Sequence, residues 1–191
     1  SLNPEAGDYA LFQKAMMRGL ARDYKGKLDI IDDMMSRYPT SGLMPSALLE
    51  KAESYVALNR ADDAVKVYRD LVKRYPTTSQ GRNGYLQLAI TLMNQGNRRQ
   101  AIDTYKEVIS SYPTSEEARV ASDDLKRIYA DDGNLDDYAK FIASVPNAPK
   151  LEAAEMDELT FRAAEKAYLN DNAATSKLRD YVSRYPGGQY E

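Results

Sequence analysis

The stretch LLEKAESYVALNRADDAVKVYRDLVKRYP, residues 48–76, decides the fold because the chain repeats its pattern 37 residues later. The second copy is YLQLAITLMNQGNRRQAIDTYKEVISSYP, residues 85–113. Both copies place apolar residues at intervals of three and four, which is the period of an α-helix. A breaker divides each copy into two such runs, Asn59-Arg60 in the first copy and Gln95-Gly96-Asn97 in the second. Each copy is therefore predicted to form a helix, a tight turn and a second helix.

Tyr-Pro dipeptides recur along the chain and mark the end of each unit. Proline lacks an amide hydrogen and disfavours the helical conformation of the residue before it, so a helix is expected to end at each site. Successive sites lie 37, 37, 33 and 40 residues apart. Repeats of this length are typical of helix pairs that stack into a solenoid. The sites are Tyr38-Pro39, Tyr75-Pro76, Tyr112-Pro113, Val145-Pro146 (where valine replaces tyrosine) and Tyr185-Pro186.

Hydroxyl residues that follow the prolines are predicted to start the next helix. Thr40-Ser41, Thr77-Thr78-Ser79 and Thr114-Ser115 are suitable N-caps. Thr114 together with Glu117 also matches a capping box.

The turns and helix lengths are predictable in the same way. Gly96 is suited to the left-handed conformation that ends a helix. In the fourth unit, four residues are missing after Gly133-Asn134 relative to the preceding unit. Four residues make about one helical turn, so the second helix of that unit is expected to be short.

Small residues indicate where the two helices of a pair meet. Ala52 and Ala64 flank the first turn, and Ala89 and Ala101 flank the second at the same spacing. Small side chains at facing positions let two helices approach closely. In the first unit, Lys27 stands where the second alanine is expected.

These residues resemble the tetratricopeptide repeat family. The family's pattern of leucine, small residue, aromatic, alanine, aromatic, apolar residue and proline is met by Leu48, Ala52, Tyr55, Ala64, Tyr68, Leu71 and Pro76. The family's usual period is about 34 residues. The longer unit here, with its Tyr-Pro-Thr junction, is similar to the repeats of bacterial envelope proteins of the barrel-assembly lipoprotein and Tol-Pal coordinator types. The resemblance implies a right-handed solenoid and a periplasmic or outer-membrane-associated location.

The resemblance also implies a binding face, because the first helices of successive pairs line the concave side in this family. An apolar stripe of this kind suits a peptide or helix partner. The alternative is that these side chains are simply core residues. By register, the implied partner-binding residues are Tyr9, Phe12, Met16, Leu49, Glu53, Val56, Asn83, Leu86, Ile90 and Met93.

The composition argues against catalysis and metal binding by this chain. It contains no histidine and no cysteine, which removes the commonest general base, metal ligand and thiol nucleophile. Asp131-Asp132-Gly133-Asn134 superficially resembles a calcium loop, but the ligand spacing fails and a turn is the better interpretation. We therefore expect no catalytic residues, no metal site and no cofactor.

Charge and hydropathy also limit the partners. The net charge is −3 with both signs mixed along the chain, so no nucleic-acid surface is predicted. No stretch reaches the roughly 18 apolar residues of a membrane span, so no membrane insertion of this segment is expected.

We predict an all-α, right-handed α-solenoid of about five helix pairs that acts as a non-catalytic protein-interaction scaffold. Two alternatives stay open. The chain is a spacer or self-association module that forms a homodimer, or it is a regulatory segment attached to a catalytic domain elsewhere. We expect a segment of a longer repeat protein, since the chain stops where another first helix should begin. The single solenoid spans residues 1–191, with units at about 5–39, 41–76, 78–113, 115–146 and 150–186.

Overall fold

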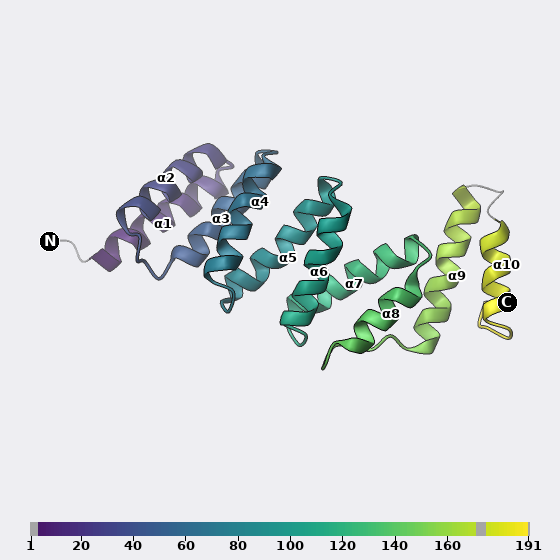
Figure 1. The fold of residues 1–191 in the computed structure, drawn as a ribbon. Coiled ribbons are helices and arrows are strands. Elements are labelled where there is room, and N and C mark those ends of the chain that lie inside the picture. Colours follow the sequence, from purple (N-terminus) through teal and green to yellow (C-terminus); the bar gives the residue numbers. More distant parts are fainter. Residues whose placement is uncertain (1–3, 171–174, 191) are drawn as a thin grey trace. The chain divides into compact units, whose positions relative to one another are not determined.

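The computed structural model describes residues 4–170 and 175–190, and the secondary structure within these ranges is entirely helical (Figure 1). The predicted all-α class is confirmed. The ten helices of the described residues are α1 (Pro4–Leu20), α2 (Tyr24–Arg37), α3 (Met44–Ala57), α4 (Ala61–Arg74), α5 (Ser79–Asn94), α6 (Arg98–Ser111), α7 (Glu116–Asp131), α8 (Leu135–Ser144), α9 (Ala153–Asn170) and α10 (Thr175–Arg184).

The chain divides into two compact units, Ser1–Val108 and Ile109–Glu191. In the first unit, α1 packs on α2 and α3 packs on α4, while α4 packs on α5 and α3 also contacts α5. In the second unit, α7 contacts both α8 and α9, and α9 packs on α10. Antiparallel pairs whose first helices touch are the arrangement of a tetratricopeptide-type solenoid. The division falls inside α6, and the single right-handed solenoid over residues 1–191 stays a prediction.

The turns inside the pairs repeat one conformation at a fixed interval. The left-handed residues Arg22, Asn59, Gly96 and Gly133 have φ of 57°, 57°, 77° and 73° and lie 37 residues apart. The amide after each one donates to the carbonyl five residues earlier, at 2.8–2.9 Å. This is the Schellman motif, which satisfies carbonyls left open at a helix end. The left-handed conformation predicted for Gly96 is confirmed.

The Tyr-Pro sites end the second helices as predicted. Tyr38 and Tyr75 are the C-caps of α2 and α4, with ψ of 60° and 48°, outside the helical region. Val145 closes α8 in an extended conformation. The short helix predicted in the fourth unit is also confirmed, since α8 has 10 residues whereas α4 has 14.

The predicted N-caps are correct for α5 and α7 and wrong for α3. Thr78 Oγ1 accepts from the Gly81 amide at 3.0 Å. The capping box of Thr114 with Glu117 is wrong, because the N-cap of α7 is Ser115. Ser115 is extended, and its Oγ accepts from the Ala118 amide at 3.0 Å.

The N-cap prediction at Thr40-Ser41 is also wrong. Leu43 precedes α3 and makes no side-chain cap. Ser41 Oγ instead accepts from the Leu43 amide at 3.1 Å and donates to Asp8 of α1. The hydroxyl therefore ties the loop to the preceding helix pair.

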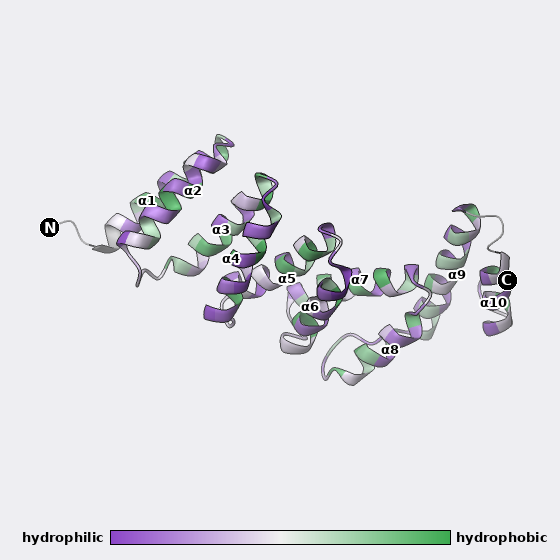
Figure 2. Ribbon diagram, turned by 45° about the horizontal axis from the view of Figure 1, so that its top comes forward, coloured by the Kyte–Doolittle hydropathy of each residue, from purple (hydrophilic) through white to green (hydrophobic). Residues whose placement is uncertain are grey.

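The small residues predicted to lie between paired helices are buried in the core of the first unit. Ala52, Ala64, Ala89 and Ala101 are all 0% exposed. Larger side chains from the second helices fill the space around them, among them Tyr68 and Leu71 of α4, which are 1% and 0% exposed. Figure 2 shows hydrophobic and hydrophilic residues alternating along the helices, as expected when one side of each helix faces a core.

Candidate partner-binding face

All ten predicted partner-binding residues lie in the first unit, on α1, α3 and α5. Two of these three helices, α3 and α5, are in contact. Gln80 Nε2 at the start of α5 donates to Ser46 Oγ of α3 at 3.1 Å. We call the outward side of α1, α3 and α5 that carries the predicted residues the first-helix face.

The side chains of this face differ in exposure. Tyr9 and Val56 are open to solvent, with 57% and 43% of their surface exposed, and Glu53 is exposed as well. Leu86 is only 7% exposed, so it belongs to the interior and offers little surface to a partner. The half-buried remainder are Phe12, Met16, Leu49, Asn83, Ile90 and Met93.

Three of the half-buried residues also contribute to the core. Phe12 and Met16 pack against the buried cluster that includes Ile31 and Met34. Leu49 packs against the cluster formed by Met44, Leu48 and Leu71. These three side chains are therefore core residues in part, and the part of each that is exposed remains open to solvent.

A buried ion pair lies at the edge of this face and was not predicted. The Lys27 side chain of α2 is 8% exposed, and its ammonium group bonds the Glu50 carboxylate of α3. The available signal was the lysine at a position that holds alanine in the next two units. The aliphatic stem of Lys27 is buried, and its ammonium group reaches the next helix pair. This position therefore links α2 to α3.

Glu53 lies one helical turn from that pair. Desolvation raises the pKa of the Glu53 carboxyl most, and Glu50 raises it further, while Lys27 acts in the opposite direction. Burial, with the Glu53 charge as a second cause, also raises the pKa of the Tyr68 phenol on α4. Glu53 is thus open to solvent yet surrounded by enough protein to disfavour its charge.

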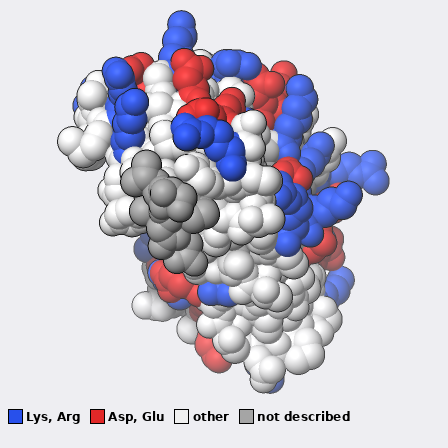
Figure 3. All heavy atoms as spheres, turned by 90° about the vertical axis from the view of Figure 1, so that its left-hand side faces the viewer, with Lys and Arg blue, Asp and Glu red and all other residues white. Residues whose placement is uncertain are grey.

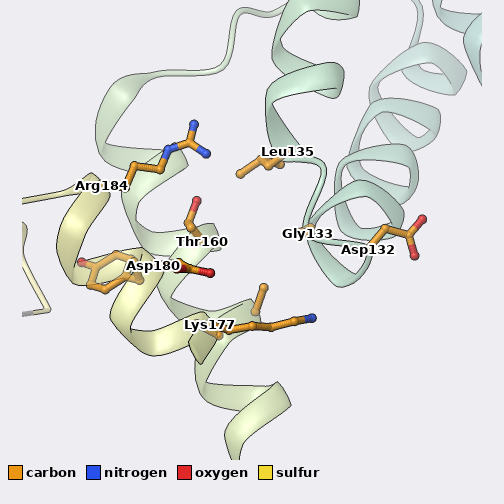
Figure 4. Close-up of a pocket in the computed structure, with 11 residues that line it drawn as sticks. Asp132, Gly133, Leu135, Thr160, Lys177, Asp180 and Arg184 are labelled. Carbon is orange, nitrogen blue, oxygen red and sulfur yellow. The ribbon is translucent and has the colours of Figure 1, made fainter. Parts of the chain in front are cut away.

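The second unit contains a cavity of about 360 Å³ that the sequence did not indicate. Figure 4 shows Lys177, Asp180 and Arg184 of α10 opposite Gly133 and Leu135 at the α7–α8 turn. Arg184 is already paired with Asp136 of α8. The repeat pattern is weakest around α9 and α10, so aligning the repeats could not predict that these residues lie close together.

Surface charge is mixed on the end of the first unit. Figure 3 shows lysine and arginine side chains beside aspartate and glutamate side chains on the face it presents. Within residues 4–170 and 175–190, no group of three or more Asp and Glu side chains is arranged to hold a metal ion. None of the helices in these ranges has both the length and the apolar composition of a membrane span.

Comparison with known proteins supports the repeat assignment. Residues 46–78 and 84–115 each match the family model of the tetratricopeptide repeat. A comparison with curated protein sequences found no match. These two segments are therefore similar to tetratricopeptide repeats.

Solved structures show the same fold over nearly the whole chain. TPR-like repeats of a protein assigned as a kinesin light chain from Podosopora anserina match in two structures, with TM-scores of 0.57 and 0.56 and identities of 13% and 12%. Each match covers 96% of this chain and 96% of the other. A thermophilic TPR protein of Thermus thermophilus matches with a TM-score of 0.51 and 17% identity, over 94% of this chain and 92% of the other.

Proposed function

We propose that this protein is a non-catalytic scaffold that binds a peptide or protein partner on its first-helix face. Tetratricopeptide repeats generally mediate protein–protein interaction. The observation that supports this face is the exposure of Val56 and Tyr9 on first helices. By contrast, the large apolar residues Tyr68 and Leu71 of the second helix α4 are buried. Exposed apolar side chains on first helices are a suitable place for a partner to bury its own apolar side chains.

The side chains on this face suit a surface that adapts to its partner. Met16 and Met93 are half-buried, and methionine is flexible and polarisable enough to adjust its packing. Ile90 contributes a half-buried aliphatic surface on α5. A partner that covers these residues would replace water by apolar contacts, at about 25 cal/mol per Å² of apolar area buried.

Site-specific crosslinking tests the location of the face. A photoreactive residue at Val56 on α3 is compared with one at Ser36, which is exposed on the second helix α2. We expect crosslinks to a distinct protein from the Val56 position and none from Ser36, with circular dichroism confirming that both variants fold. Equal crosslinking from the two positions, or none from Val56, would refute the assignment. A stable dimer in light scattering, joined through Val56, would instead establish the self-association alternative.

We also propose that the protein works in the bacterial cell envelope, at the periplasmic side or at the outer membrane. The support is the 37-residue unit with its Tyr-Pro-Thr junction, which is similar to the repeats of envelope proteins. Fractionation of cells that express the protein from its own gene tests this proposal. Recovery in the cytoplasmic fraction would contradict it.

A further inference from the structure

The first-helix face carries an acidic side chain among uncharged ones. Leu49, Glu53 and Val56 are spaced four and three residues apart on α3, so they lie on one side of that helix. The neighbouring helix α5 contributes Asn83, Ile90 and Met93, none of which is charged. Among the predicted partner-binding residues, Glu53 is the one with an acidic side chain.

The Glu53 carboxylate is influenced by one nearby cation, Lys27, whose effect on its pKa is smaller than that of desolvation and of Glu50. Within residues 4–170 and 175–190, no hydrogen bond or ion pair of the structure involves its side chain. The ammonium group that influences it, Lys27, is bonded to Glu50. Its immediate surroundings therefore combine a partly desolvated negative charge with open apolar surface at Val56.

We propose that this face selects a partner segment in which a lysine or arginine reaches Glu53 while a neighbouring apolar side chain covers Val56. This inference rests on the proposed function and specifies the chemistry of the partner. A cation at Glu53 would form a charge-assisted hydrogen bond in a partly desolvated place, where such bonds are stronger than on an open surface. An acidic segment, or the free carboxylate at the end of a chain, would instead be repelled.

Charge balance also favours this occupant over a purely apolar one. Covering Glu53 with apolar groups would remove its remaining water without supplying a counter-charge, which is unfavourable for an ionised group. Protein atoms around Glu53 already remove part of its water, and this desolvation raises the pKa of its carboxyl. A basic residue reverses that effect because it stabilises the charged form.

Selection from a displayed library of random short peptides provides the probe. We expect the enriched peptides to carry lysine or arginine beside a large apolar residue. The tightest peptide and its variant with norleucine in place of the basic residue are then titrated against the wild-type protein, Glu53→Gln and Val56→Asp. Glu53 is exposed, so the Gln variant should fold, and circular dichroism checks this.

The expected result is a loss of about tenfold or more in affinity from Glu53→Gln, the range of a charge-assisted hydrogen bond. The norleucine peptide should show the same loss on the wild-type protein and no further loss on Glu53→Gln. If Val56→Asp abolishes binding while Glu53→Gln leaves it unchanged, the partner chemistry is wrong but the face is correct. If no peptide is enriched, or Val56→Asp has no effect, the proposed function itself fails.

Discussion

Lys27 occupies a position where the next two units have alanine, and like those alanines it is buried. Gly19 of α1 makes room for it, because a Cβ added at that glycine would lie 3.1 Å from Lys27 Cδ. The stem therefore packs against α1 while the ammonium reaches Glu50 on α3. A larger residue is accommodated at the small position because its charge is neutralised by the next helix pair.

Lys27→Met tests the role of this ion pair. Methionine keeps most of the stem volume but leaves the partly buried Glu50 carboxylate without its cation. We expect a loss of about 1–3 kcal/mol in the free energy of unfolding, measured by urea denaturation. The double variant Lys27→Met with Glu50→Gln should recover part of this loss. If the losses from the two single variants add up in the double variant, the pair is not coupled.

Gly96 is suited to a test of backbone conformation alone. Its φ is 77°, and a Cβ added there meets no atom within 4 Å. Gly96→Ala should therefore destabilise the protein through backbone strain, by about 1 kcal/mol. Gly42→Ala is the matched control, because its added Cβ also meets nothing but its φ is not positive. A loss of similar size at Gly42 in thermal unfolding would rule out the conformational explanation.

The helix α7 is capped by Ser115, one of the two hydroxyl residues that the sequence predicted there, and not by Thr114 of the predicted capping box. Ser115→Ala removes the hydroxyl that accepts from the Ala118 amide, so we expect a loss of about 1 kcal/mol in the free energy of unfolding. Thr114→Ala, one residue earlier, should change stability by less than about 0.5 kcal/mol. If chemical denaturation shows a larger loss of stability for Thr114→Ala than for Ser115→Ala, the capping box at Thr114 is correct after all.

The ends and turns of the helices follow closely from sequence because their causes are local. Proline after Tyr75 and the left-handed residue Gly96 act within one turn of the chain. The burial of Leu86 could not be predicted in the same way. Its register position matches that of Leu49, but helix packing leaves Leu49 half-buried and Leu86 7% exposed. Register identifies which residues share a face, and tertiary packing decides how much of each stays open.

Across the whole molecule, stability is expected to vary from pair to pair, because each pair of a solenoid contacts only its neighbours. Among the described residues, α9 buries Ala164 and α10 buries Tyr181. By contrast, α3 and α4 bury four or more residues each. The last pair therefore depends on few interactions. They include a ring stack between Phe161 and Tyr190, whose centroids are 4.7 Å apart.

Tyr181 is the buried residue of α10, and its replacement tests whether the last helix pair unfolds independently of the first unit. Its hydroxyl donates to Asp157 of α9 at 2.5 Å, and burial followed by that bond raises its pKa to about 12. Tyr181→Ala removes a ring that is 1% exposed, a change worth about 3–5 kcal/mol for buried aromatics. We expect the amides of α9 and α10 to lose hydrogen-exchange protection while those of α3 and α4 keep theirs.

Tyr181→Phe provides the matched control, since it keeps the ring and loses only the bond to Asp157. Its effect should be about 0.5–1.5 kcal/mol for the lost bond, or somewhat more because the Asp157 acceptor is charged. Exchange in α9 and α10 should then quicken only slightly. If Tyr181→Ala accelerates exchange in α3 and α4 as much as in α9 and α10, the chain unfolds as one cooperative body. Helix pairs at opposite ends of the sequence would then share one stability, which nearest-neighbour contacts alone do not produce.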